Sequence, residues 1–228
     1  MEKLIFLTLS LTRGGAERVI CNMCNEYFVK HYEVTIISLM AAKPEYDLNP
    51  AIHLLTIDTK EEQYQQNMLV RFPRRRAGLA RVLQKLQKEG SVKALISFLP
   101  EPNFLACSLK GKYNFPVIIS VRNDPVKEYR GTFRQTMMKL LYPKASGYVF
   151  QTQMAREYFD FSTHIMESSV VIPNPIARDF LNLTPAEKRN REIVAVGRLE
   201  SQKNPMLLIH AFQKVQKRHP EYQLVFYG

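Results

Sequence analysis

Long apolar runs are missing from this chain, and cysteine is scarce. No run of about 18 apolar residues occurs among its 228 residues, so no transmembrane helix is expected. The three cysteines, Cys21, Cys24 and Cys107, are too few and odd in number for a disulfide framework, which favours a reducing compartment. The apolar stretch Leu4–Leu9 is too short for a signal peptide, and no small-residue cleavage site follows it. We predict that this stretch is a buried strand.

The usual patterns of metal ligands and of protein nucleophiles are also missing. The histidines show no ligand spacing, and no nucleophile elbow or catalytic triad spacing occurs. Cys21-x-x-Cys24 resembles a redox pair, but it lies inside a predicted helix with Cys24 on the apolar stripe, which favours buried cysteines. We therefore expect no metal and no other cofactor.

Basic residues outnumber acidic ones, and one stretch of the chain has no acid at all. The formal net charge is +11, which suits nucleic acid, anionic lipid head groups or phosphorylated small molecules, and charge alone does not choose among them. The stretch between positions 71 and 88 contains no acidic residue and seven basic ones: Arg71, Arg74, Arg75, Arg76, Arg81, Lys85 and Lys88.

A helix over this stretch has a basic face opposite an apolar one, formed by Leu79, Val82, Leu83 and Leu86. A basic amphipathic helix is typical of a membrane-surface contact. We predict that an anionic membrane faces Arg74, Arg75, Arg76, Arg81 and Lys85. The alternative is a solvated outer face whose apolar side packs on a sheet; that alternative explains the leucines but not the absence of acids.

Short apolar runs alternate with helix-period segments, which predicts βαβ units and a mainly parallel sheet. The expected strands are 4–9, 34–39, 52–57, 94–98, 117–121, 148–150 and 170–172, with helical stripes at 16–28 and 79–86 between some of them. The predicted fold is α/β, with a Rossmann-like domain over residues 1–175.

The pattern of alternating strands and helices is interrupted after the last of these strands. Pro173-Asn174-Pro175 does not continue a strand, and a polar linker is expected over 176–191. A second α/β unit follows over 192–228, with strands at 193–196 and 224–227 around a helix at 205–218. Because about 38 residues do not complete a domain sheet, we expect an incomplete second Rossmann-like domain and a truncated chain.

Two loops carry the chemistry expected of a phosphate site. Gly14 and Gly15 follow the first strand and open the first helix, where backbone N–H groups and the helix N-terminus attract anions; a plain turn that needs positive φ is the alternative. Arg198 and Lys203 lie between a strand and the helix that begins near Pro205, and this loop is at the strand end where open α/β sheets bind ligands. A solvated basic loop is the alternative for the second pair.

Three blocks of the sequence form a recognisable set: Gly-Gly-Ala-Glu from position 14, Val-Ile-Pro-Asn-Pro ending at Pro175, and Val-Gly-Arg-Leu from position 196 with Lys203-Asn204-Pro205. Together they resemble glycosyltransferase family 4, whose members are retaining enzymes of the GT-B fold. The resemblance implies that Arg198 and Lys203 hold the donor's pyrophosphate and stabilise its departure, and that Gly14 and Gly15 face it. It implies that Asn174 and Pro175 mark a hinge between the domains. Family members also have two glutamates, spaced eight apart, that address the donor sugar; the chain ends before that point.

Two further blocks fit family members that build polysaccharides and glycolipids. Arg122 and Asn123 end one strand and Thr152 follows the next, so all three are candidates for contacts to sugar or acceptor phosphate; turn and helix-cap chemistry is the equal alternative. No Asp-x-Asp occurs, which argues against the metal-dependent single-domain type of glycosyltransferase.

The predicted function is retaining sugar transfer from a nucleotide-diphosphate sugar to a glycan or polyprenyl-linked acceptor, in cell-surface polysaccharide synthesis. The expected place is the cytoplasm, peripheral at the inner face of the membrane. The alternative is a truncated, non-catalytic remnant that binds phosphate or membrane. Nucleic acid is not expected as a partner, because no recognised nucleic-acid motif or aromatic stacking platform is present.

Overall fold

The computed structural model describes residues 1–12, 14–41, 43–60, 62–176, 190–200 and 203–228. Contacts among the residues divide the chain into two compact units, Met1–Pro175 and Ile176–Gly228. The greater part of the expected linker, residues 177–189, lies outside the described residues. No helix of the described residues has the length and apolarity needed to cross a bilayer.

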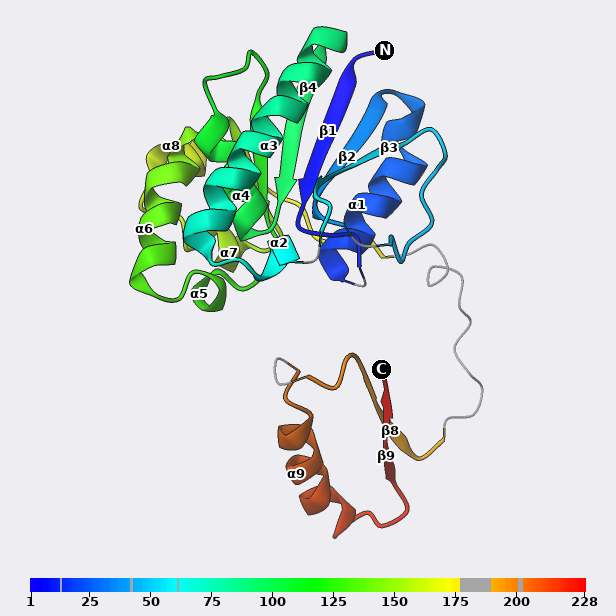
Figure 1. The fold of residues 1–228 in the computed structure, drawn as a ribbon. Coiled ribbons are helices and arrows are strands. Elements are labelled where there is room, and N and C mark those ends of the chain that lie inside the picture. The colour runs from blue at the N-terminus through cyan, green and yellow to red at the C-terminus, as the bar shows by residue number, and fades with distance from the viewer. Residues whose placement is uncertain (13, 42, 61, 177–189, 201–202) are drawn as a thin grey trace. The chain divides into compact units, whose positions relative to one another are not determined.

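The first unit is built on a seven-stranded sheet in the order β3-β2-β1-β4-β5-β6-β7, and every pair of neighbours is parallel (Figure 1). Its strands are β1 (Lys3–Thr8), β2 (Glu33–Met40), β3 (His53–Asp58), β4 (Val92–Phe98), β5 (Val117–Val121), β6 (Gly147–Phe150) and β7 (Ser169–Val171). The prediction of a mainly parallel α/β sheet is confirmed. The strands that were expected from apolar runs all form, with ends that shift by one or two residues.

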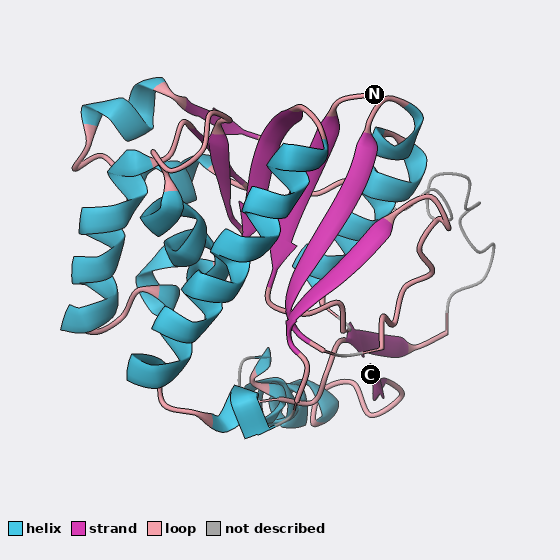
Figure 2. Ribbon diagram, turned by 45° about the horizontal axis from the view of Figure 1, so that its top comes forward, coloured by secondary structure: helices cyan, strands magenta, loops and turns pink. Residues whose placement is uncertain are grey.

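Helices cover the sheet on both sides (Figure 2). They are α1 (Gly15–Glu26), α2 (Glu62–Gln65), α3 (Met68–Glu89), α4 (Pro100–Leu109), α5 (Pro125–Glu128), α6 (Thr132–Leu141), α7 (Gln153–Glu157) and α8 (Thr163–Glu167), with short 3-10 turns at Phe28–Lys30 and Tyr142–Lys144. All six residues of β1 are buried, because the strand is covered on both faces.

Alternate residues of each central strand enter two separate cores. Leu4 and Phe6 pack with Val19 and Ile20 of α1 on one face. Ile5 and Leu7 enter the other core, to which α3, α4 and α6 contribute their apolar sides. The period of two along each strand therefore decides which helix covers which side chain.

The predicted burial of the cysteine pair is confirmed. Cys21 and Cys24 lie in α1 and Cys107 in α4, and all three are buried free thiols. Burial raises the pKa of Cys21 to about 11 and that of Cys107 to about 12, because the thiolate loses its hydration. The chain therefore presents no activated thiol among these residues.

We expect all three thiols of the folded chain to react slowly with an aromatic disulfide reagent near neutral pH, and to react fully in urea. Burial both blocks access and disfavours the reactive thiolate. Absorbance at the released thiol's band, followed with and without urea, measures this. One fast-reacting thiol in the native chain would contradict the burial of these residues.

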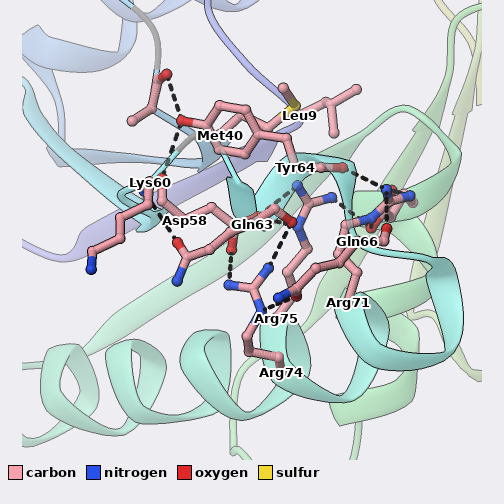
Figure 3. A network of polar contacts seen from close by, with 12 residues as sticks. Leu9, Met40, Asp58, Lys60, Gln63, Tyr64, Gln66, Arg71, Arg74 and Arg75 are labelled. Atoms are coloured by element: carbon pink, nitrogen blue, oxygen red, sulfur yellow. Dashed lines mark hydrogen bonds and ion pairs between the residues drawn. The ribbon is translucent and has the colours of Figure 1, made fainter.

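A network of ions ties α3 to the sheet, and it involves the arginines that were expected to face a membrane. Arg75 is 1% exposed and bridges two carboxylates, with its Nη2 at 2.7 Å from Asp58 Oδ2 and its Nη1 at 2.6 Å from Glu101 Oε1. Arg74 Nη1 lies 2.6 Å from Asp58 Oδ1, and Arg71 Nη2 lies 3.1 Å from Glu101 Oε2. Figure 3 shows Arg74 and Arg75 of α3 reaching toward Asp58 at the end of β3.

Hydrogen bonds extend this network into the chain that precedes α3. Arg74 donates to the side chain of Gln66 and to the backbone oxygen of Gln63. Tyr64 donates its hydroxyl proton to the backbone oxygen of Ala41, which follows β2. The network thereby fastens α2 and the start of α3 to the carboxyl ends of two strands.

The prediction that Arg74, Arg75 and Arg76 face a membrane is corrected by these contacts. Arg75 is buried between carboxylates, and the half-buried Arg74 is paired with Asp58. Arg76 donates to the hydroxyl and the backbone oxygen of Ser108. The missing acids of this stretch are supplied from β3 and α4, which the local sequence does not reveal. Arg81 and Lys85 are exposed, so the prediction stands for them alone.

Arg75→Met should lower the free energy of unfolding by about 3–5 kcal/mol, because it leaves buried carboxylates without one of their partners. Arg81→Met, the same change on the exposed side of α3, should alter it by less than about 0.5 kcal/mol. Urea unfolding followed by circular dichroism compares the two variants. If the two variants have equal free energies of unfolding, the ion pairs of Arg75 do not stabilise the fold.

The second unit contains a β-α-β arrangement as predicted. Strands β8 (Glu192–Val196) and β9 (Gln223–Tyr227) pair in parallel, and α9 (Pro205–Gln216) joins them. Asn204 precedes α9 as its N-cap, with a left-handed backbone (φ 48°) and a side-chain oxygen that accepts from the N–H of Leu207.

Candidate functional site

The carboxyl ends of the parallel strands meet at one edge of each sheet, where open α/β sheets bind ligands. In the first unit the chain leaves β1, β5 and β6 at this edge and enters the segments that hold Gly14, Arg122 and Thr152. In the second unit it leaves β8 there and enters the segment that holds Arg198 and Lys203. The structure thus places Gly14, Arg122, Thr152 and Arg198 in segments that follow the carboxyl ends of strands; their roles toward a ligand stay predictions.

Gly14 and Gly15 lie where α1 begins. A turn that needs positive φ is not the reason for Gly14. Gly14 has an extended backbone (φ −165°) and is the N-cap of α1, so positive φ does not explain it. Its N–H donates to the hydroxyl of Tyr46 at 3.2 Å, and that hydroxyl donates to the Gly14 oxygen at 3.0 Å. A Cβ at Gly14 would come within 2.1 Å of a carboxylate oxygen of Glu17, so this glycine makes room for a side chain of the first helical turn. Gly15 has open space where a Cβ would stand.

Arg122 directly follows β5 and is nearly buried, with 9% of its surface exposed. Its Nη1 lies 3.4 Å from Ser120 Oγ, and its Nη2 donates to Asn174 Oδ1. The guanidinium carbon lies 5.6 Å from the ring centre of Phe98, at the end of β4. Burial lowers the pKa of this arginine because the charged form loses hydration.

Asn123 and Thr152 make the contacts of turn and cap residues. Asn123 is exposed and donates from Nδ2 to Glu128 Oε2 at 2.7 Å. Thr152 is the N-cap of α7, and its Oγ1 accepts from the N–H of Ala155 at 3.1 Å. A role of either residue toward sugar or acceptor phosphate stays a prediction.

The last residues of the first unit were expected to mark a hinge. Asn174 and Pro175 are both exposed, and they follow β7, which is one of the two edge strands of the sheet. The hydrogen bond from Arg122 connects this segment to the end of β5. A role of Asn174 and Pro175 as a hinge remains a prediction.

The loop after β8 combines an unusual backbone with two exposed basic side chains. Gly197 has φ 147°, a conformation that a side chain would strain, and its N–H donates to Tyr227 O at 2.8 Å. Arg198 Nη1 lies 2.9 Å from Glu200 Oε1, with both side chains about half exposed. The Lys203 stem passes 3.9 Å from the position of a Cβ on Gly197, one residue before the cap of α9. Loop and helix N-terminus together offer N–H groups and two cations to an anion.

A second basic surface lies at the opposite, amino edge of the sheet. An open groove of about 670 Å³ is lined by Arg81, Lys88, Lys112 and Tyr113, with Gln84 and Gln87. The late turns of α3 and the turn before β5 form it, so it is separated from the strand ends that carry the predicted site.

Several residues near the carboxyl ends of the strands were not predicted from the sequence. Asp58 and Glu101 are far in sequence from the arginines that they neutralise, and Tyr46 lies in an irregular segment. Leu99 adopts a left-handed backbone (φ 74°) between β4 and α4, which is costly for a residue other than glycine. Asp58 could have been predicted as a partner of these arginines, because it is an acid at the end of an apolar run that shortly precedes them in the sequence.

Sequence comparisons show that the chain is similar to sugar-transferring proteins. The profile of the family described as "Glycosyl transferases group 1" matches residues 180–228. A Campylobacter jejuni enzyme named as an α-1,4-N-acetyl-D-galactosaminyltransferase that acts on an undecaprenol-diphosphate-linked glycan is 24% identical over 230 residues. That alignment covers 100% of this chain and 62% of the enzyme.

A second Campylobacter jejuni enzyme, an N-acetylgalactosamine-N,N'-diacetylbacillosaminyl-diphospho-undecaprenol 4-α-N-acetylgalactosaminyltransferase, is 28% identical over 228 residues. Its alignment covers 95% of this chain and 60% of the enzyme. The putative glycosyltransferase YtcC of Bacillus subtilis is 23% identical over 95% of this chain and 52% of its own length. The chain thus spans little more than half of the length of these curated relatives.

Solved structures share the fold at low identity. Sucrose-phosphate synthase from Thermosynechococcus elongatus superposes with a TM-score of 0.72 at 14% identity, over 99% of this chain and 62% of that one. Anabaena HepE in complex with UDP gives 0.69 at 13% identity, over 100% and 70%. The family profile and the curated relatives show that the chain is similar to the group 1 glycosyltransferases. The solved structures show that its α/β architecture is that of the GT-B fold.

Proposed function

We propose that this chain forms the acceptor-side domain and the first donor-side unit of a retaining glycosyltransferase. The donor is a nucleotide-diphosphate sugar, and the acceptor is a glycan carried on a polyprenyl diphosphate for cell-surface polysaccharide synthesis. The observation that carries the proposal is the loop after β8, where Arg198 and Lys203 stand beside Gly197 at the start of α9. The names of the two Campylobacter relatives, which include an undecaprenol diphosphate, support this acceptor class.

The proposed chemistry needs stabilisation of a departing diphosphate. The bond between the anomeric carbon and the diphosphate oxygen breaks, and the electron pair leaves with the diphosphate. The acceptor hydroxyl oxygen bonds to the anomeric carbon, and its proton passes to the leaving diphosphate or to water. Arg198 is able to fork onto two phosphate oxygens, Lys203 adds a point charge, and the N–H groups of α9 add partial charge. These groups provide positive charge without a metal ion.

The loop after β1 has a supporting role in the proposal. Gly15 is exposed and leaves open space where a side chain would stand, so an anion is able to approach the first N–H groups of α1 closely. Gly14 differs, because its N–H is already used by Tyr46. We therefore assign the closer approach to Gly15, and we assign to Gly14 the shape of the turn.

Arg198→Ala and Lys203→Ala should each weaken UDP binding by about 1.5–3 kcal/mol, because each removes a hydrogen bond to a charged group. Lys214→Ala, an exposed lysine in the last turn of the same helix, should leave the affinity unchanged. Calorimetry with UDP measures the three affinities. The proposal for this loop fails if both loop variants bind UDP as the control does.

The enzymatic part is tested by transfer of a labelled sugar from UDP-N-acetylhexosamine to a polyprenyl-diphosphate-linked glycan, with and without EDTA. We expect transfer that EDTA does not abolish and that Arg198→Ala reduces. The alternative function, a phosphate- or membrane-binding remnant, is supported by UDP binding without any transfer.

We also propose that the chain binds the cytoplasmic face of a membrane through the exposed end of α3. The set of residues differs from the sequence prediction. Arg81 and Lys85 remain, and Lys88 and Lys112 join them beside the groove at the amino edge. A peripheral position of this kind would bring the protein to an acceptor that is anchored in lipid.

Changing Arg81, Lys85 and Lys88 together to Gln should weaken binding to vesicles that contain anionic lipid, by about 1 kcal/mol for each charge. The control changes Lys43, Lys60 and Lys127, exposed lysines that follow the carboxyl ends of strands, to Gln. Vesicle co-sedimentation at low and physiological salt measures both sets. Equal losses in the two triple variants would show that only total charge matters and would reject a specific membrane face.

A further inference from the structure

Arg122 is a buried cation, and its partners in the part of the chain that the structure describes carry no negative charge. Among the described residues its guanidinium meets the hydroxyl of Ser120, the amide oxygen of Asn174 and the ring of Phe98. Its Nε is buried and has no hydrogen-bond partner there. Arg75 makes the contrast clear, because that buried arginine lies between the carboxylates of Asp58 and Glu101.

An uncompensated buried charge is costly, and a neutral amide offsets the cost only in part. A guanidinium held in this way attracts an anion strongly, because the surrounding protein screens charge less than water does. Its planar fork fits two oxygens of a phosphate or a carboxylate. The Nε of Arg122 is the donor left for the second of these oxygens.

Asn174 occupies the position in which an anionic oxygen would be expected. It is exposed, and it belongs to the irregular segment after β7. That segment leaves the sheet with a hydrogen bond from the N–H of Ile172 to Phe150 O at 2.8 Å, beyond the end of β6. Asn174 then reaches Arg122 at the end of β5, so the segment crosses the carboxyl end of β6. An exposed amide on such a segment is replaced at small cost.

We propose that Arg122 binds a phosphate ester and that Asn174 is its intramolecular competitor. Arrival of the ligand displaces the Asn174 amide and releases residues 172–175, the segment through which the first unit continues into the second. The ligand class rests on the proposed function, in which both the donor and the lipid-linked acceptor carry a diphosphate. Binding and release are coupled reciprocally, so a change that weakens the Asn174 contact must strengthen ligand binding.

The test uses pyrophosphate and the full chain, with Arg198→Ala and Lys203→Ala present so that the donor loop does not contribute. In this background Arg122→Gln should reduce pyrophosphate affinity about 10- to 100-fold. Arg130→Gln, an exposed arginine on the same stretch, is the matched control and should change it less than about twofold. Urea unfolding confirms that each variant is folded.

Two variants at the exposed position 174 give opposite predictions and leave the core untouched. Asn174→Ala removes the competitor and should raise pyrophosphate affinity about three- to tenfold. Asn174→Asp supplies a permanent carboxylate to Arg122 and should lower that affinity at least tenfold. Unchanged affinity in both variants overturns the proposal, even if Arg122→Gln binds weakly, because it would show that Asn174 does not compete.

Hydrogen exchange of the peptide over 169–176 follows the release of the segment. Pyrophosphate should speed exchange there in the parent chain and have no such effect in Asn174→Ala, where the segment is already free. UDP and farnesyl diphosphate then distinguish the two sources of phosphate, since only the true ligand class should lose affinity in Arg122→Gln. Loss for neither compound would overturn the assignment of a phosphate ester. Absence of sugar transfer would reject the proposed function while leaving these binding results intact, so the two failures are distinguishable.

Discussion

Parallel pairing of the strands is the constraint from which the other features follow. It sends all seven strands of the first unit out of the sheet at one edge, and the two strands of the second unit do the same in their own sheet. Apolar side chains fill both faces of the central strands, so polar groups are left to the strand ends. The phosphate chemistry proposed for this chain therefore has one natural place in each unit.

Ion pairs help to fix the position of the segments at this same edge. Asp58 is the last residue of β3, and Glu101 lies in the first turn of α4. Arginines of α3 neutralise both carboxylates. Satisfied pairs of this kind fix the position of the α2–α3 segment at a small net effect on stability, since desolvation offsets attraction. The basic character of α3 is thus divided between a structural half near the carboxyl edge and an exposed half near the amino edge.

The architecture was predictable from apolar periodicity because the pattern of apolar residues in each strand or helix reflects whether one or both of its faces are covered. The apolar run Leu4–Leu9, for example, has no polar alternation, and most of it lies in β1, an interior strand of the sheet. Interactions between distant residues were not predictable. The absence of acids between positions 71 and 88 favoured a membrane face, but Asp58 and Glu101 pair with three of those arginines in the folded chain. Likewise, nothing in the sequence showed that Asn174 would return across β6 to Arg122, because that contact joins residues 52 positions apart.

The identity of residue 174 has a physical sense if the fork of Arg122 serves a ligand. A carboxylate there would neutralise the guanidinium and compete too well with any incoming phosphate. An apolar residue would leave the buried cation without a third contact whenever the ligand is absent. An amide oxygen lies between these limits, because it accepts a hydrogen bond but brings no charge. A partner of intermediate strength keeps the empty site stable and still lets a doubly charged ligand shift the equilibrium, which requires only that the ligand interacts with one state better than with the other.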